Sequence, residues 1–136
     1  MTPNPSRPRT SPYAIAWRIG AALLLIALIL FSISLGQVPR WLGLYCVALS
    51  VLSAAAYWYD KRQAIAGGRR VSETSLHLLD LAGGIIGGLM AQVAWRHKTA
   101  KAEFGGMTGA IVFAHIAIIL LLDFGFVRVP GQTLFG

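Results

Sequence analysis

The chain has 136 residues, of which 56% are hydrophobic and 12% are charged. Soluble domains average about 45–50% apolar and about 25% charged residues, and the mean hydropathy here is +0.64. These values exclude a disordered chain, a collagen, a disulfide scaffold and an ordinary soluble enzyme domain, and they indicate one small integral membrane domain. The net charge of +7 is typical of basic loops that lie against anionic headgroups on the cytoplasmic side.

Three segments follow from the distribution of proline and apolar residues. We expect residues 1–18 to form a disordered basic tail, residues 19–124 a membrane helical domain and residues 125–136 a short tail. The first apolar run, residues 19–35, is just long enough to cross a hydrocarbon core of about 30 Å. A cleaved signal peptide is the alternative, but the run is longer than the usual apolar region of about 7–15 residues.

Three further apolar runs follow, at residues 42–59, 76–95 and 107–124. The second run ends in Tyr57, Trp58 and Tyr59, which we expect at the membrane interface because their rings are half apolar and half polar. A polar loop is predicted from residue 60 onward. The tryptophans lie at the edges of the runs: Trp17, Trp41, Trp58 and Trp95. The sequence therefore predicts an all-α integral membrane bundle of four hydrophobic helices.

The third run contains a glycine-rich block that makes its path ambiguous. Gly83 with Gly87, and Gly84 with Gly88, form two overlapping Gly-x-x-x-Gly pairs, a spacing that lets another helix approach closely. We interpret these four glycines as helix-packing residues and prefer a full span. A re-entrant turn at the glycine block is the alternative, and its exposed backbone groups would need protein or water partners.

The positions of Lys and Arg predict that the N-terminus lies in the cytoplasm. If the third run spans the membrane, eight basic residues lie inside and four outside. If it re-enters, ten lie inside and two outside. Charge therefore favours re-entry, whereas length favours a span.

Polar residues form a stripe on the third run when it is drawn as a helix. The stripe follows steps of three or four residues: Glu73, His77, Asp80, Gly84, Gly87 and Ala91. We expect it to face the bundle, with Leu78, Leu81, Ile85 and Leu89 pointing elsewhere. An ionised Asp at the bilayer centre costs about 2.5–3.5 kcal/mol even on the insertion scale, and we expect Asp80 nearer the headgroup boundary, where the cost is lower. Asp80 is therefore either a hydrogen-bonded clamp between helices, which we prefer, or a site that handles protons or substrate.

Several polar residues could meet in one cluster at or in the membrane. The candidates are Asp60, Lys61, Arg70, Glu73, His77, Asp80 and His115. The spacing of His77, Asp80 and His115 does not require a metal ion. We therefore predict no metal site and no cofactor.

A basic segment directly after Trp95 provides candidate anion-binding residues. They are Arg96, His97, Lys98, Thr99 and Lys101. Their positive charges and hydroxyl suit a phospholipid headgroup or a nucleotide phosphate. We prefer the simpler interpretation of a juxtamembrane anchor, in which each charge near anionic lipid contributes about 1 kcal/mol.

A family resemblance follows from motifs in this part of the chain. The motifs are Tyr59-Asp60-Lys61, Arg70-Val71-Ser72-Glu73 with Leu76-His77, Gly83-Gly84 with Gly87, and Arg96-His97-Lys98-Thr99 with Lys101 and Phe104. Over roughly residues 42–124 the chain resembles the bacterial domain of unknown function 1294 family. The resemblance implies a small, multi-pass protein of the bacterial inner membrane with no assigned activity.

Some members of that family carry a cold-shock nucleic-acid-binding domain ahead of the membrane part. Residues 1–18 are too short for such a five-stranded barrel, so we do not expect this chain to bind nucleic acid. We expect membrane lipids with anionic headgroups as partners, and the small-residue faces would support a homo-oligomer.

Three functional hypotheses remain open from the sequence. The leading one is a non-enzymatic membrane component with a cytoplasmic basic face for anionic lipid or a partner. The second is a membrane enzyme acting on a lipid-borne or nucleotide phosphate substrate, with His97 or His77 as acid/base and Asp60 or Asp80 orienting it. The third is a small oligomeric transporter or channel with Asp80 and His115 on the permeation path.

Overall fold

The computed structural model describes residues 11–95 and 101–125, which are almost entirely helical. The helices are α1 (Pro12–Ser34), α2 (Arg40–Ala66), α3 (Glu73–Leu79), the π-helical turn η1 (Asp80–Gly84), α4 (Ile85–Trp95) and α5 (Ala102–Asp123). Four helical stretches are long and apolar enough to cross a membrane: α1, α2, the stretch from α3 to α4, and α5. The predicted all-α fold with four hydrophobic helices is thus confirmed.

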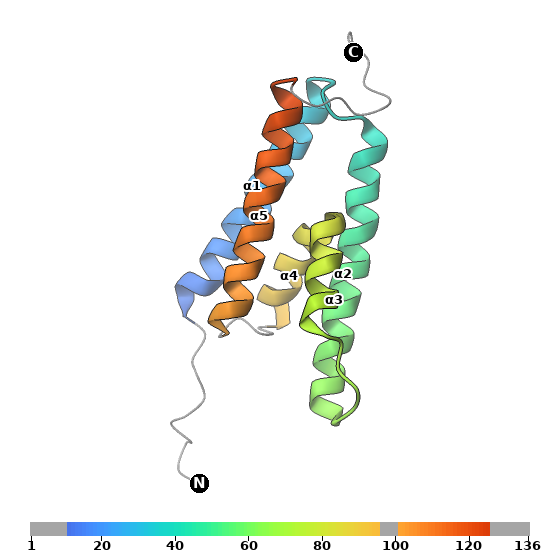
Figure 1. Ribbon diagram of the computed structural model, residues 1–136, viewed down its shortest axis with the longest axis vertical. Coiled ribbons are helices and arrows are strands. Elements are labelled where there is room, and N and C mark those ends of the chain that lie inside the picture. Colours follow the sequence, from blue (N-terminus) through green and yellow to red (C-terminus); the bar gives the residue numbers. More distant parts are fainter. Residues whose placement is uncertain (1–10, 96–100, 126–136) are drawn as a thin grey trace.

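The third stretch reverses its direction at Gly83, whose φ of 134° is not helical. In a straight helix residues 80 and 88 would lie about 12 Å apart along the axis, but here a Cβ at Gly88 would collide with the Asp80 carboxylate. Figure 1 shows α3 rising to the middle of the bundle and α4 descending beside it. The Tyr45 hydroxyl donates a hydrogen bond to the Ala82 carbonyl at this turn (2.9 Å). We call α3, η1 and α4 the hairpin.

Both ends of the hairpin lie at the same end of the molecule. Lys61 near the end of α2 donates a hydrogen bond to the Trp95 carbonyl, and Glu73 at the start of α3 lies 2.6 Å from Lys101 before α5. Each arm has 11 or 12 residues, about 16–18 Å, whereas the hydrocarbon core is about 30 Å thick. The third stretch thus follows the fold-back path that loop charge favoured, rather than the straight span that length favoured.

Two helices extend further than the hydrophobic runs predicted. α1 begins at Pro12 rather than at residue 19, because the Ser11 hydroxyl accepts a hydrogen bond from the Tyr13 amide (3.2 Å) and proline suits the first helical position. Part of the predicted N-terminal tail is therefore helical. α2 continues into the predicted polar loop and ends before Gly67, which has a φ of 70°. Residues 1–10 and 126–136 of the predicted tails lie outside the described residues.

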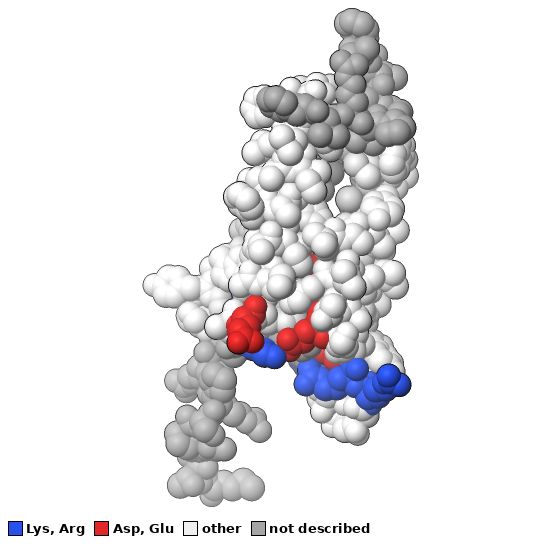
Figure 2. Space-filling model, in the orientation of Figure 1, with Lys and Arg blue, Asp and Glu red and all other residues white. Residues whose placement is uncertain are grey.

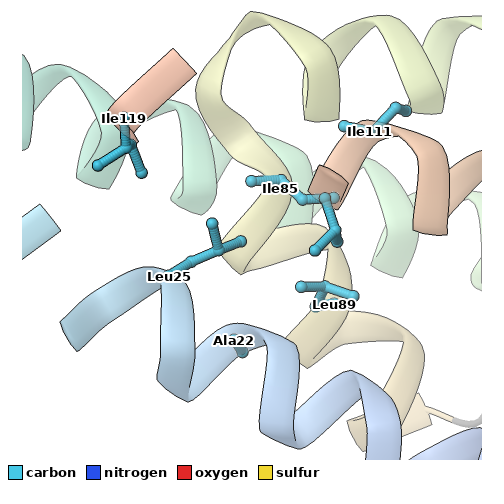
Figure 3. Packing of buried hydrophobic residues seen from close by; sticks show 7 residues of the cluster. Ala22, Leu25, Ile85, Leu89, Ile111 and Ile119 are labelled. Atoms are coloured by element: carbon cyan, nitrogen blue, oxygen red, sulfur yellow. The ribbon is translucent and has the colours of Figure 1, made fainter. Parts of the chain in front are cut away.

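The main apolar core forms where α4 packs between α1 and α5. Ala22 and Leu25 of α1 meet Ile85 and Leu89 of α4, and Ile111 of α5 completes the contact (Figure 3). The expectation that Ile85 and Leu89 point away from the bundle was wrong, since both are buried. The reason is that α4 lies inside the bundle and is covered on more than one side.

The opposite side of the hairpin lies directly against the backbone of α2. A Cβ at Gly87 would collide with the Ser50 carbonyl, and one at Gly84 would lie 2.7 Å from the Leu49 oxygen. The missing side chains therefore allow a backbone-to-backbone contact that larger residues would prevent.

The fold-back path predicts which side of the membrane each connection faces. In a Cys46→Ala background, Ser72→Cys and Ala102→Cys should react with a membrane-impermeant maleimide from the same side, and Ser34→Cys from the opposite side. Sealed vesicles of both orientations would provide the measurement. Labelling of residues 72 and 102 from opposite sides would contradict the hairpin.

The close contact with α2 predicts a strong effect of one methyl group. Gly87→Ala should lower the free energy of unfolding by about 1–3 kcal/mol, because the new Cβ overlaps the Ser50 carbonyl. SDS-induced unfolding followed by circular dichroism would measure the change. Gly106→Ala is the matched control, since a Cβ there has no atom within 4 Å. Equal effects of the two substitutions would refute this packing.

Candidate functional site

The Asp80 carboxylate lies fully buried inside the bundle. The Ser53 hydroxyl donates a hydrogen bond to its Oδ1 (2.6 Å), and the Tyr57 hydroxyl donates to its Oδ2 (2.7 Å). Ser53 and Tyr57 lie one turn apart on α2, so they present both donors on one face. Gly88 leaves the space that the carboxylate occupies. Asp80 thus joins the turn of the hairpin to α2.

Hydrogen bonds continue from Tyr57 to the other helices. The Gln92 amide nitrogen on α4 donates to the Tyr57 hydroxyl (3.1 Å) and to the Thr108 hydroxyl on α5 (3.4 Å). The Arg18 Nε on α1 donates to the Gln92 Oε1 (2.7 Å). All six side chains are at most 1% exposed. We call them the polar network: Arg18, Ser53, Tyr57, Asp80, Gln92 and Thr108.

Sequence reasoning identified only Asp80 of this network as a candidate site residue. Tyr57 was expected at the interface beside Trp58 and Tyr59, but it is fully buried, whereas the two neighbours are exposed. A signal was present, because polar residues of α2 follow steps of three and four: Ser50, Ser53, Tyr57 and Asp60. Arg18 has no such signal, because in the sequence it only adds to the basic charge before the first apolar run.

Asp60 on α2 binds residues of the loop that connects α2 to α3. Its buried carboxylate accepts hydrogen bonds from the Val71 amide (3.0 Å) and from the Arg70 guanidinium, whose Nη2 lies 3.2 Å from Oδ2. Asp60 and Arg70, both predicted cluster residues, are thus together. Their contact positions the loop at the end of α2.

Lys61 and Glu73, two more predicted cluster residues, tie the hairpin to its neighbours. Lys61 binds the Trp95 carbonyl, and Glu73 pairs with Lys101, one of the predicted anion-binding residues. Glu73 and Lys101 are about half exposed, so the pair adds little stability, about 0–1 kcal/mol. The ion pair does show that the starts of α3 and α5 lie next to each other.

The two described histidines lie in different surroundings. The His77 ring packs against Phe104 with 4.3 Å between ring centroids. His115 makes a hydrogen bond to the Ile111 carbonyl of its own helix (2.8 Å) and lines a cavity of about 210 Å³ beside the hairpin turn. Within residues 11–95 and 101–125, no three His, Cys, Asp or Glu side chains are grouped to hold a metal ion.

Charged side chains gather at the end of the molecule where α1 begins and α2 ends. Figure 2 shows them at the lower end of the face in view, below a largely uncharged body. Six described basic residues belong to this end: Arg18, Lys61, Arg62, Arg69, Arg70 and Lys101. Arg40 starts α2 at the other end. We call the first group the basic end. Arg96, His97, Lys98 and Thr99 lie outside the described residues.

The four candidate spans indicate a multi-pass membrane protein. Residues 50–104 match the model of a family described as proteins of unknown function, DUF1294. This match confirms the family resemblance, over a shorter stretch than residues 42–124. It covers much of α2, the whole hairpin and the start of α5. No curated protein and no solved structure matches the chain.

The matched stretch contains the hairpin together with the polar contacts that Asp80 makes to α2. Both Asp80 oxygens accept hydrogen bonds from hydroxyl groups, so the geometry suits a clamp between helices. Within the described residues, Asp60 and His77 also have structural contacts. His97, which the enzyme hypothesis used, lies outside them.

The central position of Tyr57 predicts a measurable loss of stability. Tyr57→Phe removes a hydroxyl that donates to Asp80 and accepts from Gln92, so the free energy of unfolding should fall by about 1–3 kcal/mol. SDS titration of the purified chain would measure it. Tyr59→Phe is the control, because Tyr59 is 48% exposed. A loss no larger than that of the control would remove Tyr57 from the network.

Proposed function

We propose that this chain is a non-enzymatic component of the bacterial inner membrane whose basic end lies at the cytoplasmic surface and binds anionic lipid headgroups. The N-terminus, the loop after α2 and the segment after α4 then share the cytoplasm. The segment after α5 faces the other side.

The fold-back path of the hairpin carries this proposal. With that path, six of the seven Lys and Arg residues in the described ranges fall on one side of the membrane and Arg40 on the other, and the loop-charge count over the whole sequence becomes ten against two. Such an asymmetry sets orientation, and it also concentrates positive charge at one leaflet. Because anionic lipid gives that leaflet a negative surface potential, each nearby Lys or Arg contributes about 1 kcal/mol of attraction.

Trp58 provides a reporter of lipid at the basic end. The Arg62 guanidinium lies 4.8 Å from the centre of its indole ring. In a variant that keeps Trp58 as its only tryptophan, brominated phosphatidylglycerol should quench the fluorescence more than brominated phosphatidylcholine does. Added salt should reduce the difference, because it screens exposed charges.

Charge removal at this end should weaken the preference for anionic lipid. Arg62→Gln with Arg69→Gln should lower it by up to about fivefold for each charge, as about 1 kcal/mol per charge implies. Arg40→Gln removes a charge from the other end of the described chain and should leave Trp58 quenching unchanged. Equal quenching by the two brominated lipids at low salt would contradict lipid binding and favour a protein partner.

A further inference from the structure

Arg18 has one guanidinium nitrogen that the described residues leave without an acceptor. Its Nε donates to Gln92 and its Nη1 to the Ala14 carbonyl, but Nη2 is buried and has no hydrogen-bond partner among them. No described carboxylate pairs with Arg18 either, although the side chain is 1% exposed. The guanidinium lies over the Trp17 ring (4.6 Å to its centre), but a ring face supplies neither a counter-charge nor an acceptor for Nη2, and burying such a charge is costly. An anion would supply both the missing acceptor and the missing charge.

A cavity of about 400 Å³ lies beside this guanidinium, between α1 and α5. Arg18 and Lys101 provide its charged walls, and the other lining residues are Ala14, Trp17, Ala102, Gly105 and Gly109. None of these is acidic. A Cβ at Gly105 would lie 3.3 Å from Arg18 Nη2, so the unpaired nitrogen faces the first turns of α5.

The start of α5 adds a second attraction for an anion. Lys101 is the N-cap residue, no side chain caps the first-turn amides, and Glu103 is the acidic residue of that turn. The first amides of a helix have no partners within the helix, and together with the helix dipole they favour negative charge. A helix start, a buried guanidinium and Lys101, whose ammonium also pairs with Glu73 (2.6 Å), therefore border one cavity.

The cavity lies near the start of α1, next to a tryptophan of the kind found at the headgroup level. Arg18 lies six residues after the start of α1, about 9 Å along the helix axis. Trp17 beside it is 37% exposed, and tryptophan prefers the headgroup level. The residues at the cavity are at the basic end, where anionic headgroups are expected.

We propose that the cavity between α1 and α5 is a binding site for one phosphate group, held by Arg18, Lys101 and the amides at the start of α5. An anionic phospholipid is the source that fits this position beside Trp17 at the basic end. The inference rests on the proposed function and deepens it, since it replaces a diffuse attraction by one defined site.

Native mass spectrometry of the intact chain in detergent tests the site with three probes: phosphatidylglycerol, phosphatidylcholine and inorganic phosphate. We expect one phosphatidylglycerol molecule to bind saturably and more tightly than phosphatidylcholine. Gly109→Leu should weaken this binding by at least about tenfold, because its side chain fills the cavity and keeps phosphate from Arg18. Arg18→Gln should do the same, but Gly109→Leu keeps the polar network whole and tests the site even if Arg18→Gln misfolds.

Gly106→Leu is the matched control on the same helix. Neither glycine has an atom within 4 Å of an added Cβ, yet only Gly109 lines the cavity. The control should change the dissociation constant by no more than about twofold. Saturable binding of inorganic phosphate that Gly109→Leu abolishes would support the same site with a soluble source. Equal behaviour of the two variants, or no one-to-one complex with either anionic probe, would overturn the proposal.

The failure of the site and that of the proposed function give different results. Arg62→Gln with Arg69→Gln removes exposed charge away from the cavity, so it should leave the single-site dissociation constant nearly unchanged. If Trp58 quenching shows no lipid preference but the one-to-one complex persists, only the diffuse attraction fails. If the preference exists and Gly109→Leu has no effect on the complex, only the site fails.

Discussion

A helix that turns back inside a hydrocarbon layer leaves backbone groups that water cannot satisfy, so protein must satisfy them. The hairpin meets this constraint through α2. Tyr45 donates to the Ala82 carbonyl at the turn, and Ser53 and Tyr57 hold the Asp80 carboxylate. The glycine surface of α4 permits the close contact that these bonds require. The turn at Gly83, the glycines and the buried polar groups are thus all required by the fold-back path of the hairpin.

The charges at the two ends of the polar network determine the direction of every hydrogen bond between them. Arginine can only donate, so the Gln92 oxygen faces Arg18 and its nitrogen faces Tyr57. The Tyr57 hydroxyl accepts from Gln92 and therefore donates to Asp80. Such a chain polarises its members in the same sense, which strengthens each bond in a medium of low dielectric constant. The neutral groups thus connect two opposite charges that are not in direct contact.

The sequence predicted the helices and the ambiguity of the third one, because apolar runs and glycine spacing are local properties. It could not determine the path, since the reversal depends on the backbone of one residue, Gly83, and on its tertiary contacts. Loop charge was the better guide here, because it reflects both ends of a segment at once. The length of an apolar run shows only that the run could span the membrane.

The network escaped prediction for the same reason. Arg18 and Gln92 are 74 residues apart, and Tyr57 and Asp80 are 23 apart, so no local pattern joins them. The interfacial position expected for Tyr57 followed from its neighbours Trp58 and Tyr59, which do face outward. What the sequence did offer was the spacing of Ser53 and Tyr57 on one face of α2, a pattern that gains meaning only once a partner is known.

The polar network ends at Arg18, and the proposed phosphate site begins at the same guanidinium. The positive charge of Arg18 is what the site would use to attract an anion. The Gln92 oxygen accepts from Arg18 Nε, and the Ala14 carbonyl accepts from Nη1. The remaining nitrogen faces α5, whose nearest lining residue is a glycine without a side chain to offer. An acceptor must therefore come from outside the described network. A phosphate in the cavity would accept a hydrogen bond from Arg18 Nη2. The hydrogen bonds that connect Arg18 to Asp80 would stay unchanged.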